Sequence, residues 1–293
     1  MSGARLWIAV AVTMTAFAAN SILNRFAVDG GSIDALSFAL IRVLAGAGML
    51  SVLVLASGRR PRLPATGRLL TAAGLSLYLL GFSVAYVHLD AGLGALILFG
   101  GVQLTMFAAG LVGGEAIPAR RWVGAGGAMA GLAVLCWPAG DVSAPIIGLV
   151  SMALAALGWG SYSLLGRRAK DPLAETAASF LIAVPIVWAP LLVWPVSPEG
   201  PAPITALGYA LAIASGAVTS GLGYALWYAI LPRIAASTAA LVQLSAPLLA
   251  VAGGAVLLSE PVTWRIALAA VLILGGIAYG LAAPQRTSNS SGS

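Results

Sequence analysis

Cysteine and histidine are nearly absent from this chain, whose 293 residues include one of each, Cys136 and His88. A single cysteine excludes an intrachain disulfide framework, and one cysteine with one histidine cannot build a Cys/His zinc site. An enzyme that works inside a membrane needs a nucleophile paired with a base, or a metal cluster. The apolar part of the sequence holds neither, so we predict no catalytic residue, no metal, no cofactor and no enzymatic activity.

Charged residues are also scarce. They make up 8% of the sequence, whereas hydrophobic residues make up 60% and the mean hydropathy is +0.99. Soluble domains carry about 25% charged residues. Residues 69–112 form a hydrophobic run of about 44 residues that only His88 and Asp90 interrupt, roughly twice the length that one membrane-crossing helix needs. The composition therefore predicts a polytopic membrane protein.

Apolar stretches of about 20 residues recur along the chain between Gly, Pro, Arg and Asp residues. Unpaired backbone groups are very costly in hydrocarbon, and no segment alternates like a barrel strand, so each stretch is predicted to be a helix. The approximate spans are 6–27, 35–57, 67–87, 91–113, 122–137, 146–165, 173–194, 204–230, 237–258 and 263–283. The predicted fold class is an all-α polytopic membrane protein with ten transmembrane helices.

The distribution of positive charge predicts the orientation of these spans. With the N-terminus inside, the inner connections and tails hold Arg5, Arg59, Arg60, Arg62, Arg68, Arg120, Arg121, Arg167, Arg168, Lys170, Arg233 and Arg286. The outer connections hold mainly acidic residues. This bias places both termini in the cytoplasm, with the spans among lipids. The Arg residues form short loop clusters rather than a basic surface, so no nucleic-acid partner is expected.

Residues in the two halves of the chain match at a fixed offset. The first span resembles the sixth through the pairs Phe17/Trp159, Asn20/Tyr162, Ser21/Ser163 and Arg25/Arg167. The two members of each pair are 142 positions apart (159 − 17). At the same offset the third span resembles the eighth through Gly81/Gly223, Phe82/Tyr224 and Tyr86/Tyr228. Each copy would contain five helices. Because five is an odd number, the second copy would start on the opposite side of the membrane from the first and would therefore be inverted. Chance matches in Ala-rich and Gly-rich sequence are the alternative.

The repeat sets the predicted domain boundaries. Residues 1–140 form the first five-helix repeat, residues 141–286 form the inverted second repeat, and residues 287–293 are a disordered tail or a vector-derived remnant. One chain with two complete halves can enclose a pathway, so a monomer is the expected state.

Several segments resemble the drug/metabolite transporter superfamily, specifically its ten-helix exporters with paired EamA-type halves. The resemblance is carried by residues 240–249 with Pro247, by residues 257–261 with Glu260 and Pro261, by Gly275 and Gly276, and by Arg42 within residues 38–44. Within the superfamily the chain is most similar to YddG-like exporters of aromatic and other amino acids. The resemblance implies a multi-pass protein of the bacterial inner membrane that exports amino acids from the cytoplasm by alternating access.

Polar and aromatic side chains in the middle of the spans are the predicted substrate contacts, because inverted repeats bind solutes near the membrane midplane. Ring faces suit an apolar side chain, and amides and hydroxyls suit polar groups. The predicted contacts are Phe17, Asn20, Tyr78, Phe82, Gln103, Trp159, Tyr162, Tyr224, Trp227, Gln243 and Ser245. Hydrogen bonding between helices is the alternative role for the amides, and interfacial anchoring is the alternative for aromatics near span ends.

Three further residues are predicted to act in gating or coupling. Arg42 lies about two turns inside the second span, where it either faces the pathway or reaches toward the outer surface beside Asp34. Pro247 frees a backbone carbonyl in the ninth span or simply kinks it. His88 lies at the outer end of the third span and either senses pH or is only a connecting residue.

Glu175, the third residue of the span 173–194, is the only Asp or Glu inside a predicted span, and none lies in the middle of one. The membrane-embedded carboxylate that carries a proton or attracts a cationic drug is therefore missing. This absence favours a neutral or zwitterionic small molecule, and we predict export of amino acids that are aromatic or large and apolar. A nucleoside, a purine or a hydrophobic drug is the alternative substrate.

Overall fold

The structure is a computed structural model that describes residues 3–28, 31–58, 66–86, 88–89, 91–137, 145–193, 204–258 and 264–282. Every regular element in the described ranges is helical. The elements are α1 (Gly3–Val28), α2 (Ala35–Ala56), α3 (Thr66–Tyr86), α4 (Ala91–Val112), α5 (Ala119–Cys136), α6 (Ile146–Gly166), α7 (Pro172–Val193), α8 (Ala206–Ala214), the π-helix η1 (Ser215–Leu222), α9 (Gly223–Ile230), the 3-10 turn η2 (Leu231–Arg233), α10 (Ala236–Gln243), α11 (Ser245–Leu258) and α12 (Trp264–Leu281). The predicted tail 287–293 and the 259–261 motif lie outside the described residues.

Seven helical segments are long and apolar enough to cross a membrane. They are Gly3–Val28, Ala35–Ala56, Arg68–Ala85, Ile146–Gly166, Pro172–Pro190, Ala206–Arg233 and Trp264–Leu281. The described parts of α4 and of α10 with α11 are shorter apolar helices, and α5 starts with Arg120 and Arg121 after Ala119. The all-helical membrane character of the chain is thus confirmed, and ten crossings stay a prediction.

The distribution of side chains is the reverse of that in a soluble protein. Large apolar residues such as Val112, Leu104, Val256 and Val271 are exposed, whereas Asn20, Arg42, Gln103, Gln243 and a set of hydroxyl residues are buried. Exposed apolar surface on this scale requires an apolar surrounding. Lipid on the outside and polar groups on the inside are the arrangement that a membrane imposes on a helical bundle.

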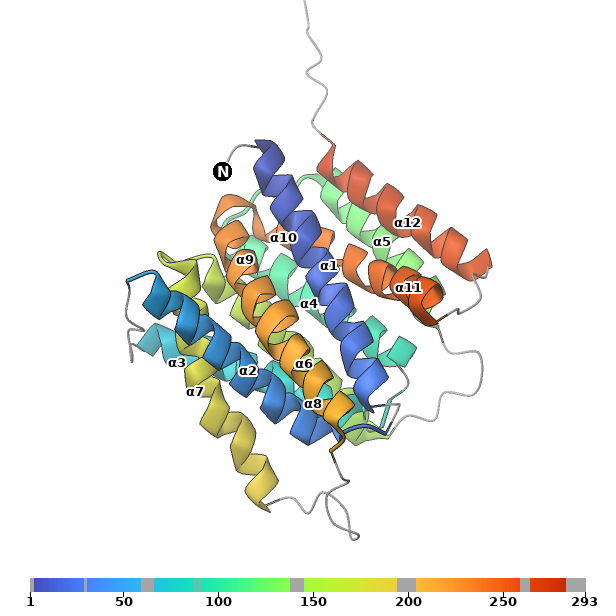
Figure 1. Ribbon diagram of the computed structural model, residues 1–293. Coiled ribbons are helices and arrows are strands. Elements are labelled where there is room, and N and C mark those ends of the chain that lie inside the picture. The colour runs from blue at the N-terminus through green and yellow to red at the C-terminus, as the bar shows by residue number, and fades with distance from the viewer. Residues whose placement is uncertain are drawn as a thin grey trace, which may run out of the picture.

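Helices from the two halves of the chain pack against one another throughout the bundle. α3 packs on α6, α5 on α12, α2 on α7 and η1, and α1 on α9, η1 and α11. Figure 1 shows α5 and α12 together at one side of the bundle, α2, α3 and α7 at the other, and α1, α6, α8 and α9 between them. The centre of the bundle is therefore shared by helices from both halves.

Glycines allow the backbones of α3 and α6 to approach closely. A Cβ atom on Gly158 would lie 2.6 Å from the carbonyl oxygen of Gly74 and 2.6 Å from the backbone nitrogen of Tyr78. A Cβ atom on Gly81 would lie 2.6 Å from the carbonyl oxygen of Ser151. Small residues give this close contact in membranes, where no hydrophobic effect drives helices together. The contact fixes Tyr78 of α3 next to the aromatic residues of α6.

Two interruptions shape the second half of the chain. α8, η1 and α9 form one continuous helical segment whose middle turn has π geometry. α10 ends at Gln243, and α11 begins at Ser245. Pro247 accounts for this break, because its ring clashes with the carbonyl of the residue four positions earlier, Gln243, and it has no N–H to donate to it.

The described carboxylates lie at helix ends rather than in helix interiors. Asp34 caps α2 by accepting hydrogen bonds from the backbone N–H groups of Leu36 at 3.1 Å and Ser37 at 2.9 Å. Glu115 accepts from Arg121 at 2.9 Å and from the backbone N–H of Ala236 at 3.1 Å, at the start of α10. A carboxylate at a helix N-terminus satisfies free N–H groups and favours the helix dipole.

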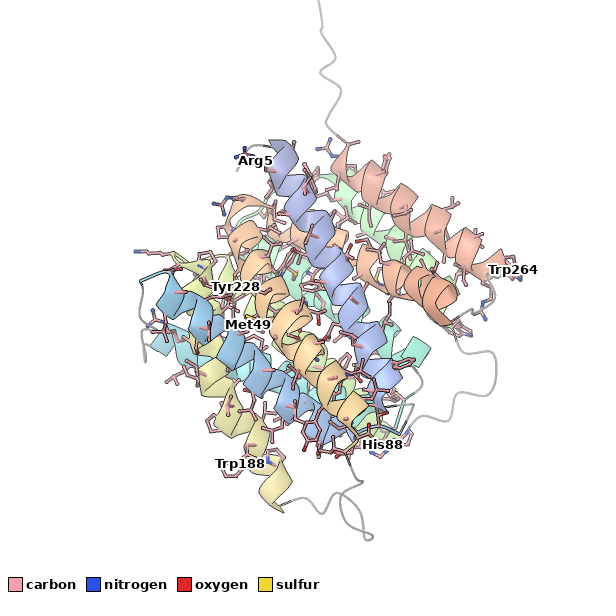
Figure 2. All side chains as sticks on the ribbon, in the orientation of Figure 1. Arg5, Met49, His88, Trp188, Tyr228 and Trp264 are labelled. Carbon is pink, nitrogen blue, oxygen red and sulfur yellow. The ribbon has the colours of Figure 1, made fainter. Side chains whose placement is uncertain are left out.

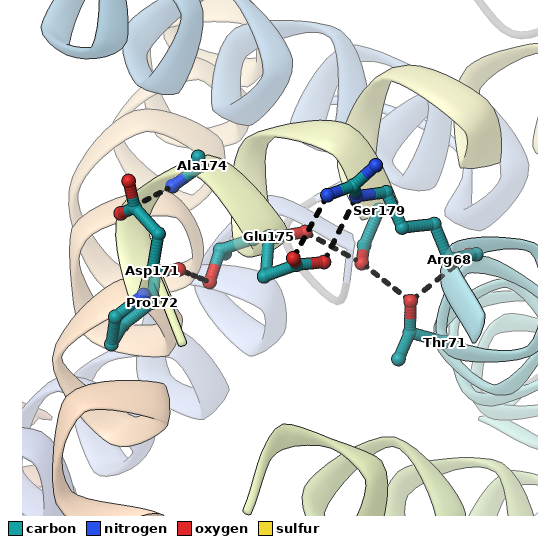
Figure 3. Close-up of polar contacts among 8 residues, drawn as sticks. Arg68, Thr71, Asp171, Pro172, Ala174, Glu175 and Ser179 are labelled. Atoms are coloured by element: carbon teal, nitrogen blue, oxygen red, sulfur yellow. Dashed lines mark hydrogen bonds and ion pairs between the residues drawn. The ribbon is translucent and has the colours of Figure 1, made fainter. Parts of the chain in front are cut away.

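An ion pair joins the first turns of α3 and α7. Arg68 donates from Nε and from one terminal nitrogen to the two carboxylate oxygens of Glu175, both at 3.0 Å (Figure 3). One turn further on, the Ser179 hydroxyl donates to Thr71 Oγ1 at 2.9 Å. Both residues of the ion pair are partly exposed, as expected near the end of a bundle. On the predicted orientation, this contact lies at the cytoplasmic side.

A buried aromatic and polar cluster

Nine aromatic side chains from five elements meet in the centre of the bundle. This central cluster consists of Phe17, Tyr78, Phe82, Trp159, Tyr162, Phe180, Tyr224, Trp227 and Tyr228. Trp159 is in the middle, with ring centroids 4.7 Å from Tyr224, 5.0 Å from Tyr78 and 5.3 Å from Phe17. Phe17 is half-buried and the other rings are buried. Residues from both predicted repeats thus form one continuous aromatic surface.

Edge-to-face packing orients several of these rings. Phe17 lies at interplanar angles of 83° to Trp159, 84° to Tyr224 and 73° to Trp227. Such geometries match the positive ring edge with the negative ring face and fix each ring in place. The close contact between α3 and α6 and the packing of α1 on α9 bring these residues together.

Arg42 is buried beside the cluster, with 2% of its side chain exposed. Its Nε donates to Ser220 Oγ at 2.7 Å, and one terminal nitrogen donates to the Tyr224 hydroxyl at 2.5 Å. The guanidinium carbon lies 5.7 Å from the centre of the Tyr78 ring. The side chain of Asp34 is engaged in capping α2. Of the two roles predicted for Arg42, the structure thus supports an inward-facing residue rather than one that reaches the outer surface.

Asn20 joins α1 to the π-helical turn. Its Oδ1 accepts hydrogen bonds from Ser215 Oγ at 2.6 Å and from Thr219 Oγ1 at 3.0 Å. The π turn therefore presents one pair of hydroxyls to Asn20 while Ser220 and the following Tyr224 face Arg42. π-helical turns occur often at functional sites, because they re-aim side chains within a helix.

Two buried glutamines, Gln103 of α4 and Gln243 of α10, form a further set of hydrogen bonds, one of them to Trp159. The indole Nε1 of Trp159 donates to Gln243 Oε1 at 2.6 Å. Gln243 Nε2 is within 3.2 Å of both Met106 Sδ and the carbonyl oxygen of Ala239. Gln103 donates to the carbonyl oxygen of Ala240 at 3.1 Å. These contacts connect α4, α6 and α10 at the broken helix.

Two further hydrogen bonds join α6 to α9. Trp227 Nε1 donates to Ser163 Oγ at 3.1 Å, and the Tyr228 hydroxyl donates to the carbonyl oxygen of Tyr162 at 2.9 Å. The Tyr162 hydroxyl and Gln103 Oε1 are buried and have no hydrogen-bond partner among the described residues. Buried polar atoms of this kind usually require a partner, which a bound solute or water can supply.

Seven of the eleven predicted contact residues are rings of the central cluster, and Gln243 is hydrogen-bonded to one of them. Asn20 is bonded to η1 and Gln103 to α10, and Ser245 lies apart. Ser245 is only half-buried, and its hydroxyl donates to the carbonyl oxygen of Val242 in its own chain segment at 2.7 Å. His88 is exposed in a turn after α3, and Arg5 and His88 lie at opposite ends of the bundle (Figure 2). Gating by His88 or Pro247 stays a prediction.

Phe180 and Tyr228 belong to the central cluster but were not among the predicted contacts. Phe180 of α7 lies 5.8 Å from Tyr224, between ring centroids. Its one polar neighbour at helical spacing is Thr176, and a threonine suits a lipid-facing helix as well as a buried one, so the sequence does not distinguish Phe180 from a lipid-facing residue. Tyr228 does have such a signal, because it follows Tyr224 by one helical turn.

The chemistry available in the cluster is stacking and hydrogen bonding. The side chains in and around it offer ring faces, indole and hydroxyl groups, three amides and one guanidinium. Among the described residues, no group of three or more His, Cys, Asp or Glu side chains could hold a metal ion. Such a site can bind a small molecule that has an apolar part and a polar part.

Comparison with known proteins identifies relatives and a fold. Residues 146–280 match the model of the EamA-like transporter family. A Pseudomonas aeruginosa protein named uncharacterized protein PA1977 is 45% identical over 282 residues, which cover 96% of each chain. A solved protein crystal structure is similar with a TM-score of 0.79 and 18% identity, over 94% of this chain and 97% of that chain.

Proposed function

Because residues 146–280 match the model of the EamA-like transporter family, we propose that the chain is a transporter of this family and exports amino acids across the bacterial inner membrane. The preferred substrates are aromatic or large apolar amino acids. The observation that carries this proposal is the central cluster, where rings and hydrogen-bonding groups from both halves of the chain meet with no described carboxylate among them. Ring faces receive the apolar side chain, and amide, hydroxyl and guanidinium groups receive the dipolar end.

Alternating access of two inverted five-helix halves is the proposed mechanism. The helix packing supports it. If the two halves are equivalent, each helix of the first half has a counterpart in the second: α1 corresponds to α6, α2 to α7, α3 to the α8 to α9 segment, α4 to α10 and α11, and α5 to α12. When each helix is replaced by its counterpart, the contact of α3 with α6 becomes that of α9 with α1, and the contact of α4 with α6 becomes that of α11 with α1. Both members of each pair occur, and α2 with α7 and α5 with α12 map onto themselves. An inverted repeat has this property.

The inverted arrangement makes a direct topological prediction. Single cysteines introduced at Arg59 and at Glu199, in a Cys136→Ala background, should react with membrane-impermeant reagents from opposite sides of the membrane. The cysteine at position 59 should be labelled only in inside-out vesicles, and the cysteine at position 199 only in intact spheroplasts. Labelling of both positions from one side would remove the inverted repeat and the mechanism built on it.

The proposed substrate class is tested by flux in proteoliposomes. Vesicles that contain the purified protein and are loaded with unlabelled L-phenylalanine should accumulate trace radiolabelled L-phenylalanine faster than protein-free vesicles. Unlabelled L-tryptophan and L-methionine should compete. The rival substrates enter the same panel as adenosine, hypoxanthine and ethidium. Competition by one of these, with none from the amino acids, would replace the proposed substrate class. A flux that rises linearly with concentration would indicate a channel.

A further inference from the structure

Arg42 is a buried cation whose known partners carry no charge. Within the described ranges, ion pairs join Arg68 to Glu175 and Arg121 to Glu115, and none includes Arg42. Its guanidinium instead contacts two hydroxyls and a ring face, those of Ser220, Tyr224 and Tyr78. These groups solvate a cation with dipoles but do not neutralise it.

Arg42 carries its charge at membrane depth, where a cation without an opposite charge nearby is energetically costly. Arg42 lies about 10 Å from the start of α2, at the helical rise of about 1.5 Å per residue, and no described carboxylate lies in a helix interior near it. Charged side chains at membrane depth normally face a cavity or pair with an opposite charge. Two of the five guanidinium N–H donors form hydrogen bonds to Ser220 and Tyr224, and Tyr78 also contacts the guanidinium. A guanidinium with this many donors can bind a planar anion in addition to these hydroxyls.

We propose that Arg42 binds the carboxylate of the transported molecule, whose apolar part lies against the central cluster; this assignment rests on the proposed transport function. A guanidinium fork matches two carboxylate oxygens, and Ser220 and Tyr224 hold its plane in one orientation. Tyr78 and Tyr224, which contact the guanidinium, also contact Trp159 at 5.0 Å and 4.7 Å between ring centroids. The anion site and the aromatic surface are therefore contiguous.

The geometry of the π turn also supports this assignment. η1 supplies Ser220, and Tyr224 follows at the start of α9. Gly216 of η1 lies in close contact with the backbone carbonyl of Arg42, so the π turn packs against α2 at the residue whose side chain it binds. A helix that departs from α geometry at the point where it holds a buried cation is typical of a binding site.

A purely structural role for Arg42, as a tie between α2 and η1, makes a different prediction. A structural tie affects every solute equally and acts through folding. A carboxylate site discriminates between solutes that differ only in that group, because a buried donor set is left unpaired by a ligand that lacks the carboxylate.

The first experiment uses the wild-type protein and requires no variant. Hydrocinnamate has the phenyl ring and the carboxylate of L-phenylalanine without the amine, and phenethylamine has the ring and the amine without the carboxylate. Hydrocinnamate should compete with labelled L-phenylalanine in proteoliposomes, and phenethylamine should need at least a tenfold higher concentration for equal inhibition. Equal inhibition by the two compounds would overturn the assignment.

Variants then connect this discrimination to Arg42. Arg42→Gln should raise the half-saturating concentration of L-phenylalanine at least tenfold and should abolish the preference for hydrocinnamate over phenethylamine. Arg42→Lys keeps the charge without the fork, and Ser220→Ala leaves the guanidinium intact but less fixed; each should give a smaller loss. Arg5→Gln removes an exposed arginine and is the control. Retention of the hydrocinnamate preference in folded Arg42→Gln protein would sink the proposal.

A binding measurement separates this inference from the proposed function. If wild-type vesicles transport no amino acid, the proposed substrate class fails, and thermal unfolding of the purified protein still tests Arg42. Hydrocinnamate should raise the unfolding temperature of the wild-type protein by several degrees, phenethylamine should not, and the shift should be absent in Arg42→Gln. Equal shifts from both compounds, or no shift from hydrocinnamate, count against an anion site.

Discussion

The contact between α5 and α12 and the central cluster are two regions packed by opposite means. In the first, backbones touch: a Cβ atom on Gly124 would lie 2.5 Å from the carbonyl oxygen of Gly276 and 2.8 Å from the Cα atom of Gly280. In the second, large side chains fill the space between helices, with hydrogen bonds such as that of Trp159 to Gln243 at 2.6 Å. We infer that the contact between α5 and α12 supports the fold, whereas the central cluster can bind a solute.

The physical basis of this difference lies in the membrane. Helices in lipid associate through close van der Waals packing or through polar contacts, because no hydrophobic effect separates them from the solvent. A glycine contact has one close-packed arrangement, whereas rings and hydrogen-bonding side chains can change partners during a transport cycle. We therefore expect substitutions between α5 and α12 to affect stability and substitutions in the central cluster to affect flux.

The largest expected effect is that of Gly124→Leu. The new side chain would meet the backbone of α12, which cannot move aside as a flexible side chain can. The unfolding free energy should fall by at least about 3 kcal/mol, the upper range for overpacking, which thermal unfolding in detergent would measure. Gly126→Leu is the matched control, because a Cβ atom there meets nothing within 4 Å. Equal destabilisation by both variants would contradict the close-contact account.

Asn20→Leu should have the next largest effect. It removes the acceptor of two buried hydroxyls, those of Ser215 and Thr219. An unsatisfied buried donor costs about 1 to 3 kcal/mol, so we expect a loss of about 2 kcal/mol together with a clear loss of flux. Asn24→Leu, one turn further along α1 at a half-buried position, is the control. If the two variants were equally stable, the hydrogen bonds of Asn20 would have no structural weight.

Trp159→Phe should reverse the balance between stability and flux. It keeps a ring in the cluster and removes the donor to Gln243, so the stability cost should be about 1 kcal/mol, near the value for hydrogen bonds in membranes. Flux of L-phenylalanine should fall at least tenfold. The control is Trp188→Phe, at a tryptophan of α7 that is 50% exposed. A large loss of stability with normal flux would show that Trp159 has a structural role and does not contact the solute.

The smallest expected effect is that of Glu175→Gln at the partly exposed ion pair with Arg68. Solvent screens such pairs, so the unfolding free energy should change by less than about 1 kcal/mol. Raising the salt concentration should reduce the difference between the variant and the wild type. A salt-independent loss larger than that of Trp159→Phe would show that this contact, and not the centre, holds the two halves together.

The sequence predicted the central cluster better than it predicted the details of the helices. Tyr78, Trp159 and Tyr224 were recognisable because aromatic residues with polar atoms are unusual in the middle of an apolar span. Phe180 was not, since a phenylalanine suits both lipid and an aromatic cluster, and only the packing of α7 distinguishes the two. The break at Leu244 was foreseen as a kink at Pro247, but the effect of proline falls on the residue one turn earlier.

The partners of Arg42 show another limit of sequence reasoning. Asp34 precedes Arg42 by two turns and is the nearest acidic residue in the chain, so pairing toward the outer surface was one of two interpretations. The structure uses Asp34 to cap α2 and gives Arg42 the hydroxyl of Ser220, 178 positions away along the chain. A partner so far away can be found only through the packing of α2 on η1. The π geometry of η1 itself has no signal in residue type.

The π turn gives residues 215–222 one residue more than an α-helix between the same two ends would need. Deletion of a single residue there would let the segment relax into an ordinary α-helix and leave the flanking turns in place. Tyr224 and Trp227 would then still face α1 and α6, but Asn20 and Arg42 would lose the separate hydroxyls that the wide turn presents to them. A deletion within α9 would instead rotate every later side chain by about 100° about the helix axis, the angle per residue of an α-helix. Shortening the π turn should therefore weaken binding, whereas shortening α9 should disrupt the packing of its rings.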